Sequence, residues 1–423
     1  MGTFIYNWGN PLLLENAYLC IEQQKNKTEY KKMLGNFTYY NPTKVHFGKD
    51  ALSLLGEELK NYGPKVMLTY GGGSIKRNGI YDQVVKVLKD AGKTIIEEPG
   101  VMPNPDIEKV LEGAAIARKE QVDLILAVGG GSTSDYAKAV AGSAYQDKDV
   151  LQYYFKDHGA LDCRWIPVGV VLTMVGTGSE MNRGSVISSH KENLKLFNYF
   201  RSPDFAILNP EFTFTVPQYQ MVAGIYDIMS HILEQYLSGN DDNTSDYLSE
   251  GLMRGLVASS LKALKNPKDY EARSNIMWTA TWALNGLIAC GKTEDWMVHM
   301  LGQAVAGFTN ATHGHTLSAV TDAYYRLLID KSEDAVARFK RLAENVWNVN
   351  AEGKTDKAVA IEGLEAMEAW MRKIGMAMSL EEVGGRAEDI EGYADATPIN
   401  TGGYHILTRD EVIEVFRNSL KNK

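Results

Sequence analysis

The sequence predicts an α/β N-terminal domain with a Rossmann-like parallel sheet, residues 33–216, followed by an all-α C-terminal domain, residues 217–423. From Phe37 to about Pro217, short β-branched runs alternate with amphipathic helical patterns, which is typical of a parallel sheet wound with helices. Beyond Pro217 only helical periodicities remain, broken by Asn-Pro, Gly-Asn and Gly-Gly clusters. A chain of 423 residues is also long enough for two domains of about 150–200 residues each.

The elements of the first domain follow from these patterns in order. Strands are predicted at 65–70, 93–97, 122–128 and 164–173, with shorter strands at 186–187 and 205–208. Helices are predicted over 81–92 and 106–121, and helical spacing returns after Asp135. Residues 1–32 are interpreted as an N-terminal extension, either an artefact or an ordered arm, because Met33 is a natural start and Asn-Pro-Leu-Leu-Leu is too short for the core of a signal peptide.

Composition excludes several classes of function. The net charge of −9 disfavours binding to nucleic acid or to anionic membranes, both of which depend on an excess of Lys and Arg. No apolar run approaches the roughly 18 residues that a membrane span needs. Three scattered cysteines, Cys20, Cys163 and Cys290, support neither a disulfide framework nor a thiolate zinc site, so a reducing, cytoplasmic location is expected.

A glycine-rich turn follows the predicted strand 122–128 and runs from Gly129 through Gly130 and Gly131 into a helix. Backbone N–H groups and the positive end of a helix dipole hold a pyrophosphate at such a turn, and glycine removes the Cβ atoms that would block its approach. A tight structural turn explains three glycines equally well, and neither the Gly-x-Gly-x-x-Gly nor the P-loop fingerprint is present.

A second turn, Gly71-Gly72-Gly73, follows the strand 65–70 and continues into Ser74, Lys76 and Arg77. A hydroxyl and two cations, with no carboxylate to accept a bond from a ribose 2′-hydroxyl, suit a 2′-phosphate, so NADP(H) is favoured over NAD(H). The alternative is that both cations are ordinary solvated charges. A third polar stretch, 173–182, follows the strand 164–173. Its hydroxyls are candidates for the nicotinamide side of a cleft, and Lys195 for contact with a ribose or phosphate oxygen; the alternative is an ordinary polar loop.

The helical domain carries a candidate metal site. Asp227 and His231 are four residues apart on one predicted helix, so both side chains lie on one face about 5–6 Å apart. His299 and His313 are separated by about 21 Å on an unbroken helix, so the chain has to turn back within the breaker-rich interval 307–314, with His313 delivered from a loop. One Asp and three His suit Fe²⁺, Zn²⁺, Mn²⁺ or Co²⁺. A lone Asp-x-x-x-His is weak evidence, since such pairs also cap ordinary helices.

Taken in order, these motifs resemble those of the iron-containing, group III alcohol dehydrogenase family over about residues 37–423. The resemblance is carried by Met-Pro-Asn104-Pro, Gly-Gly-Gly-Ser-Thr-Ser-Asp-Tyr-Ala-Lys at 129–138, Gly-Thr-Gly-Ser-Glu at 176–180, Asp227-x-x-x-His231, and His299 with His313. Within the family, Gly-Gly-Gly-Ser at 71–74 and Glu-Asp-Trp-Met-Val-His299 are similar to the butanol dehydrogenase and aldehyde reductase branch, whose members commonly prefer NADPH.

The resemblance implies a dehydroquinate synthase-like architecture with a cleft between the domains, and a homodimer. It implies that one divalent ion, with Fe²⁺ favoured, is bound by Asp227, His231, His299 and His313. It implies dinucleotide contacts from Gly71, Gly72, Ser74, Asn104, Gly130, Gly131, Ser132, Asp135, Thr173, Thr177 and Lys195. The chain departs from the family at Gln303, where a histidine with a proton-relay role is common; His315 either takes that role or is simply exposed, and exposure is the preferred interpretation.

The expected activity is hydride transfer between NADP(H) and a small or medium aliphatic alcohol or aldehyde such as butanol or butanal. The ion would act as a Lewis acid on the substrate oxygen. Trp282, Trp296 and Phe308 are candidates for an apolar substrate pocket, although aromatic residues at such spacing are more often core. An NAD-dependent polyol dehydrogenase of the glycerol type is the alternative. A dehydroquinate-synthase-like lyase fits poorly, because only Lys292 is basic between Cys290 and His315.

Overall fold

The computed structural model describes residues 35–192, 194–239 and 243–421, so the predicted extension, residues 1–32, lies outside the described residues. The first half is built on a six-stranded parallel sheet in the order β1-β8-β5-β4-β2-β3. Its strands are β1 (Lys44–Phe47), β2 (Lys65–Tyr70), β3 (Thr94–Glu98), β4 (Leu124–Gly129), β5 (Val168–Leu172) and β8 (Phe205–Leu208). An antiparallel pair, β6 (Gly184–Ser189) and β7 (Leu194–Tyr199), stands apart from this sheet.

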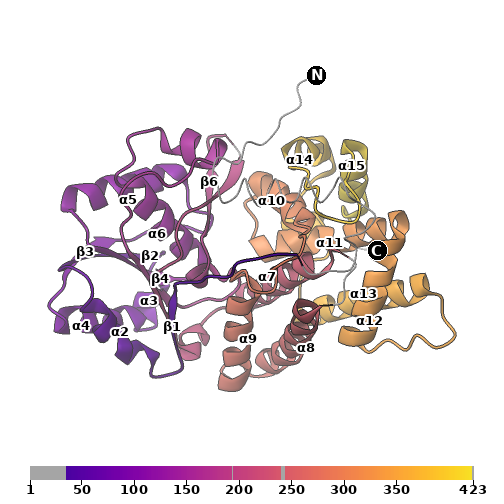
Figure 1. The fold of residues 1–423 in the computed structure, drawn as a ribbon, viewed down its shortest axis with the longest axis horizontal. Coiled ribbons are helices and arrows are strands. Elements are labelled where there is room, and N and C mark those ends of the chain that lie inside the picture. The colour runs from indigo at the N-terminus through magenta and orange to yellow at the C-terminus, as the bar shows by residue number, and fades with distance from the viewer. Residues whose placement is uncertain (1–34, 193, 240–242, 422–423) are drawn as a thin grey trace.

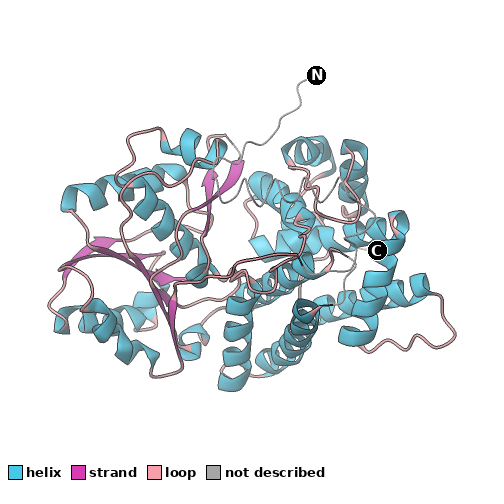
Figure 2. Cartoon of the chain, viewed as in Figure 1, coloured by secondary structure: helices cyan, strands magenta, loops and turns pink. Residues whose placement is uncertain are grey.

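Helices cover both faces of the sheet (Figures 1 and 2). On one face, α5 (Ile107–Glu120) and α6 (Gly131–Ser143) pack against Met67, Ile125 and Ala127. On the other face, α2 (Leu55–Leu59), α3 (Ser74–Arg77) and α4 (Ile80–Asp90) pack against residues such as Val66, Leu68 and Leu126. Side chains at alternate strand positions therefore pack into two separate cores, which explains why the buried strands have continuously apolar sequences.

The second half is helical throughout its described residues, as the sequence predicts. Its helices are α7 (Gln218–Tyr236), α8 (Thr244–Lys265), α9 (Tyr270–Ala283), α10 (Met297–Thr309), α11 (His313–Lys331), α12 (Glu333–Trp347), α13 (Asp356–Ile374), α14 (Ile390–Ala396) and α15 (Arg409–Asn418). Every residue from Met221 to Tyr236 in α7 is buried, with α8, α9, α10 and α11 packed around it. None of the described helices is both long and apolar enough to cross a membrane.

The structure differs from the sequence-based elements at several boundaries. The strand predicted from residue 164 begins at Val168, directly after Pro167, which has no N–H to donate to the sheet. The helix expected after Asp135 begins at Gly131, inside the glycine motif itself. Two strands were not predicted: β1 is a four-residue strand at the sheet edge, and β7 lies outside the main sheet.

Two glycines bring the halves of the molecule into backbone contact. A Cβ atom on Gly224 of α7 would lie 2.2 Å from the carbonyl oxygen of Val175, in the loop that follows β5. A Cβ atom on the neighbouring loop residue Gly176 would lie 3.1 Å from Oδ2 of Asp227. The loop after β5 therefore rests directly on the buried helix that carries Asp227, with no side chain between the two backbones.

We predict that Gly224→Ala destabilises the protein, because the added methyl group meets a backbone oxygen that cannot move without shifting the loop. The expected cost is about 1–3 kcal/mol, measured as a lower midpoint of urea unfolding. Gly255→Ala is the matched control, since Gly255 lies within α8 and a Cβ atom there has nothing within 4 Å. Alanine at this position should stabilise α8 by roughly 0.5–1 kcal/mol. Equal shifts in the same direction would contradict the close contact.

Candidate functional site

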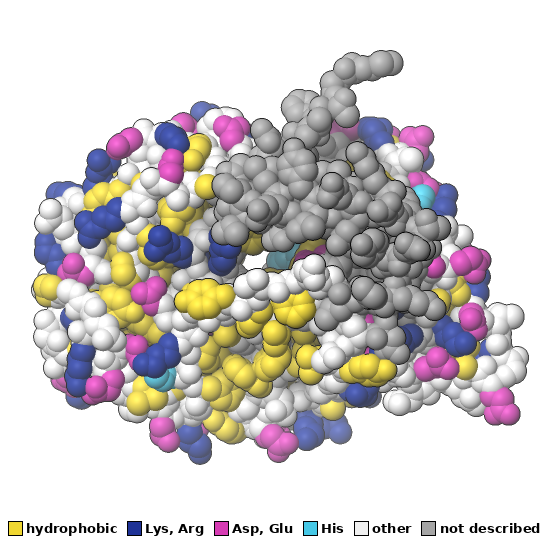
Figure 3. Space-filling view, viewed as in Figure 1, with side chains coloured by type: hydrophobic (Ala, Val, Ile, Leu, Met, Phe, Trp, Pro, Cys, Tyr) yellow, Lys and Arg dark blue, Asp and Glu magenta, His cyan; other side chains and the backbone are white. Residues whose placement is uncertain are grey.

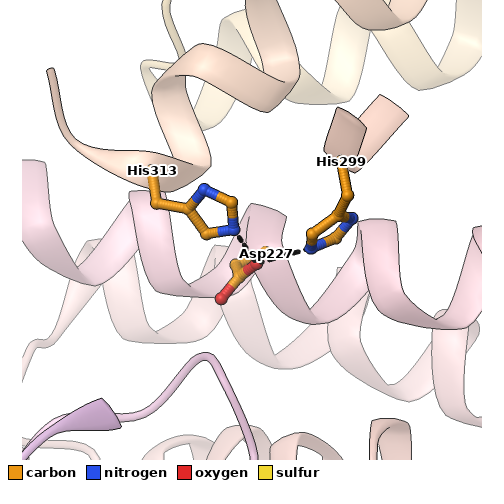
Figure 4. Close-up of side chains that lie close together, drawn as sticks. All are labelled: Asp227, His299 and His313. Atoms are coloured by element: carbon orange, nitrogen blue, oxygen red, sulfur yellow. Dashed lines mark ion pairs between the residues drawn. The ribbon is translucent and has the colours of Figure 1, made fainter. Parts of the chain in front are cut away.

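The structure brings the four predicted metal-binding residues to one point. Asp227 and His231 come from one face of α7, His299 comes from α10, and His313 is the first residue of α11 and not part of a loop as expected. Oδ1 of Asp227 lies 3.6 Å from Nε2 of His231, 3.6 Å from Nε2 of His299 and 3.5 Å from Nε2 of His313. Figure 4 shows His299 and His313 approaching Asp227 from opposite sides.

The atoms at this point fit a bound cation. Oδ1 of Asp227 and Nε2 of His299 are buried and have no hydrogen-bond partner among the described residues, whereas buried polar atoms normally have one. Asp227, His299 and His313 each offer a ligand atom within 4.8 Å of the other two, and His231 joins them through its contact with Asp227. A divalent ion between these atoms would give each of them a partner.

The electrostatics of the cluster keep two imidazoles neutral and the carboxylate charged. Burial lowers the pKa of His231 to about 4 and the pKa of His313 well below its usual value, and neutral imidazole is the form that binds metal. Burial raises the pKa of Asp227, but the histidines around it outweigh burial and hold that pKa far below its usual range. Burial lowers the pKa of His299, but Glu234 and Asp227 outweigh it and raise this pKa to about 9.

The glycine-rich loops gather at the carboxyl edge of the sheet. The first loop follows β2, the second follows β4 and the third follows β5, and these three strands are neighbours in the order β5-β4-β2. The predicted dinucleotide contacts of the three loops therefore lie side by side in the order Gly71, Gly72 and Ser74, then Gly130, Gly131 and Ser132, then Thr173 and Thr177. The second and third loops are in close contact, because a Cβ atom on Gly131 would lie 2.3 Å from Oγ1 of Thr177. The amino end of α6 opens onto this edge, as expected for a phosphate site.

Lys195 and Asn104 lie between this edge and the candidate metal ligands. Both line a small pocket between the halves, together with Asn310 from the end of α10. The amide of Asn104 donates to that of Asn310 at 3.3 Å, and both residues have left-handed backbone conformations. Burial lowers the pKa of Lys195 to about 8, while the charges of Asp227 and Asp135 act in the opposite direction. Lys195 therefore faces the carboxylates of both halves.

Both domains match known proteins. Residues 42–210 match the iron-containing alcohol dehydrogenase family, and residues 221–420 match the C-terminal region of the same family. The chain belongs to this family. It is 40% identical over 394 residues to the probable NADH-dependent butanol dehydrogenase 2 of Bacillus subtilis, covering 91% of this chain and 100% of that one. It is 35% identical over 355 residues to the NADPH-dependent aldehyde reductase YqhD of Escherichia coli, covering 83% and 90%.

A solved structure shares the whole architecture. The NADH-dependent butanol dehydrogenase A of Thermotoga maritima superposes with a TM-score of 0.87 at 35% identity, covering 92% of this chain and 100% of that one. The family and the fold expected from the sequence are confirmed, and the enzyme is an oxidoreductase of the alcohol dehydrogenase and aldehyde reductase type.

Asp135, a predicted dinucleotide contact, makes hydrogen bonds inside the N-terminal domain. It is buried, one of its oxygens accepts from the Ser179 hydroxyl, and the other accepts from the backbone N–H of Val186 at 3.1 Å. Lys138, one turn later on α6, is fully buried and donates to Ser179 O and to the carbonyl and side-chain oxygens of Asn182. Both side chains thus tie α6 to the third loop and to β6, and support the cleft from within.

The carboxylate of Glu97, which was not predicted as a site residue, lies beside Tyr70, Tyr81 and Lys76. Glu97, near the end of β3, accepts from the hydroxyl of Tyr70 at 2.7 Å and from that of Tyr81. Lys76 lies over both rings, at 4.9 Å and 4.4 Å from their centroids. The loop at 71–77 supplies no carboxylate itself, but the parallel pairing of β2 with β3 brings Glu97 beside it.

His315 is neither exposed nor directed at the metal ligands. It is 1% exposed, its Nδ1 accepts from the backbone N–H of Ala377 at 3.2 Å, and its Nε2 lies 3.3 Å from the carbonyl oxygen of Tyr219. Its ring is stacked on Tyr219 at 4.1 Å. The expectation that His315 is exposed is wrong, and contacts at both ring nitrogens leave it no hydrogen-bonding capacity for a proton relay; Gln303 remains one turn after His299 on α10.

Trp296 is the predicted pocket aromatic that lies at the site. Its ring meets those of His299 and His231 edge to face, at 5.3 Å and 6.1 Å. Phe308 instead packs on Tyr393, and Trp282 packs on Trp278, so neither contacts the cluster. A hollow opens near the centre of the face shown in Figure 3, with a histidine visible at its floor, basic side chains to its left and hydrophobic side chains below it.

We predict that Lys138→Met lowers the stability of the enzyme, because it leaves Asp135 and three oxygen atoms buried without their cation. Removing one partner of a buried charged pair costs about 3–5 kcal/mol, to be measured by urea unfolding at pH 7. Lys86→Met is the control: Lys86 pairs with Asp90 on the exposed surface of α4, and its removal should cost about 0.5 kcal/mol or less. A loss no greater than that of the control would show that Lys138 does not hold the third loop.

Proposed function

We propose that this enzyme transfers hydride between a nicotinamide dinucleotide and a small or medium aliphatic alcohol or aldehyde, such as butanol or butanal, at a bound divalent metal. The observation that carries the proposal is the convergence of three imidazole nitrogens on one buried carboxylate oxygen, within reach of the loops at the sheet edge. Relatives named as butanol dehydrogenases and as an aldehyde reductase support the substrate class.

Asp227, His231, His299 and His313 would hold the metal. Nitrogen and carboxylate ligands suit Fe²⁺, which the family name favours, and equally Zn²⁺, Co²⁺ or Mn²⁺. When bound, such an ion supplies a Lewis acid that polarises the oxygen of the substrate.

The chain supplies binding, orientation and exclusion of water. The loops after β2, β4 and β5 would hold the dinucleotide along the sheet edge, with Lys195 meeting a ribose or phosphate oxygen. Trp296 covers His231 and His299 with an apolar ring, which favours an aliphatic substrate and limits the access of water. Gln303 cannot take up or release a proton, so proton transfer at this enzyme would not pass through that side chain.

We predict that His299→Ala lowers kcat/KM for butanal by more than about 100-fold, because replacing a direct ligand should cost more than replacing a residue that supports one. Bound metal, measured by elemental analysis, should fall in parallel, while binding of the dinucleotide, measured by fluorescence titration, should stay close to wild type. His405→Ala is the control, since His405 is bonded to Glu411 in the first turn of α15 and not to any of the four proposed ligands. Activity retained by a metal-free His299→Ala enzyme would refute the metal assignment.

NADP(H) is the proposed dinucleotide. Ser74, Lys76 and Arg77 are all exposed where the ribose of the adenosine would lie, and their charge suits a 2′-phosphate. The name of the NADPH-dependent relative from Escherichia coli supports this assignment. NAD(H) is the second candidate, because Glu97 provides a carboxylate beside the same loop and four relatives at 36–40% identity are named as NADH-dependent.

We predict that Lys76→Ala raises KM for NADPH by roughly tenfold and leaves KM for NADH nearly unchanged, since a charge-assisted bond to phosphate is worth about 1.5 kcal/mol or more. Initial rates with butanal and each dinucleotide would measure both values. Lys86→Ala, on the exposed surface of α4, serves as the control for a general loss of positive charge. An equal effect of Lys76→Ala on both dinucleotides would favour NAD(H).

A further inference from the structure

A glutamate outside the proposed ligand set holds one of the ligands. Glu234 is 1% exposed and lies on α7, three residues after His231. Its Oε2 accepts from the backbone N–H of His299 at 3.0 Å, and its Oε1 lies 2.5 Å from Nδ1 of the same histidine. Ser230 also donates to Oε1, at 2.6 Å. One carboxylate therefore fixes both the backbone and the ring of His299.

We propose that Glu234 is a positioning residue for the metal, acting through His299; this inference rests on the proposed function. A carboxylate only accepts hydrogen bonds, so in the neutral form of His299, which is the form that binds metal, the ring proton stays on Nδ1 and the lone pair lies on Nε2. Nε2 is the atom that faces Asp227. Glu234 thus selects the tautomer that can bind a metal and fixes the orientation of the ring. It also makes Nε2 of His299 a stronger electron-pair donor to a metal than the Nε2 of a histidine bonded to a neutral group.

The three histidines of the cluster are not equivalent in this respect. Nδ1 of His231 and Nδ1 of His313 are buried and have no hydrogen-bond partner among the described residues. His299 is the one whose second nitrogen meets a carboxylate within the described part of the chain. Loss of Glu234 should therefore act on a single ligand and leave the contacts of Asp227 with the other two histidines in place.

Glu234 also has a structural task, and a test has to separate the two. His299 lies in the first turn of α10, whose N-cap residue Trp296 makes no side-chain cap, so Oε2 satisfies an N–H group that the helix leaves open. Asp295 does the same for the N–H of Met297 at 3.0 Å, and it is 2% exposed and bonded to the Tyr324 hydroxyl at 2.6 Å. Asp295 supports the start of α10 without contacting a ligand, which makes it the matched control.

The test is the Co²⁺ affinity of the metal-free protein, measured by competition with a chelator, together with the visible absorption of the Co²⁺ form. Glu234→Gln should weaken Co²⁺ binding by about 10–100-fold and shift the absorption bands of the Co²⁺ form. The side-chain NH₂ group of glutamine cannot accept a hydrogen bond from the groups that donate to Glu234, so it no longer orients the His299 ring. The melting temperature of the metal-free variant should fall no further than that of Asp295→Asn. Asp295→Asn should lower the melting temperature and leave both Co²⁺ readouts at wild-type values.

Four outcomes would overturn the inference. Glu234→Gln could bind Co²⁺ with the affinity and spectrum of wild type, or Asp295→Asn could weaken Co²⁺ binding as much as Glu234→Gln does, which would reduce Glu234 to a helix cap. If the wild-type protein takes up no Co²⁺, the proposed metal site itself fails, and that result is distinguishable because it precedes any variant. If Glu234→Gln does not fold, Ser230→Ala replaces it in the test. This variant removes the hydrogen bond from Ser230 to Oε1 of Glu234 and should weaken Co²⁺ binding by roughly two- to tenfold. An unchanged absorption spectrum of its Co²⁺ form would refute the proposal.

Discussion

The charge of Asp227 is the constraint on which the helical half depends. Asp227 is 4% exposed in the middle of α7, where every residue from Met221 to Tyr236 is buried. An ionised carboxylate in such surroundings is unfavourable by several kcal/mol unless it is paired or coordinates a metal. Three imidazoles, one from α7 itself and two from α10 and α11, surround one oxygen atom of Asp227 at 3.5–3.6 Å without a hydrogen bond to it, an arrangement that fits a cation bound among them. The packing of these three helices is thus organised around a polar point inside an apolar bundle.

The sheet contributes through its carboxyl edge. Parallel strands place all of their following loops on one side, so the order of the strands alone puts the glycine-rich loops after β2, β4 and β5 next to each other. The third loop then reaches α7 at Gly224, beside Asp227. Asp135 and Lys138 are buried inside the N-terminal domain and bind this loop at Ser179. The loop therefore contacts α7 through its backbone and is held to its own domain by buried charged side chains.

Much of this arrangement could be predicted from local patterns. Strands β2, β4 and β5 are buried apolar runs. Helix periodicity placed Asp227 and His231 on one face of α7, whereas the full set with His299 and His313 rested on the resemblance to the family. Short or half-exposed strands such as β1 and β7 carry too little apolar pattern to be recognised. Glu97 was missed because its place beside the loop at 71–77 depends on the pairing of β2 with β3, which no local pattern states.

Glu234 and His315 show the same limit in the helical half. Glu234 follows Asp227 by seven residues, on the same face of α7 as His231, and that spacing could have pointed to it. His315 was considered for a proton relay because it lies two residues after His313 in the sequence. Residues two apart on a helix face different directions. The ring of His315 therefore contacts the backbone of Tyr219 and Ala377.

The contact between Val175 and Gly224 has a consequence for how such an enzyme diversifies. Because backbone atoms of the two halves touch there, the spacing between the sheet edge and Asp227 is independent of the side chains that line the rest of the cleft. Exchanging side chains around Trp296 would therefore leave this spacing unchanged. A side chain added at Gly224 would instead meet the carbonyl oxygen of Val175 at 2.2 Å and alter the distance between the two halves.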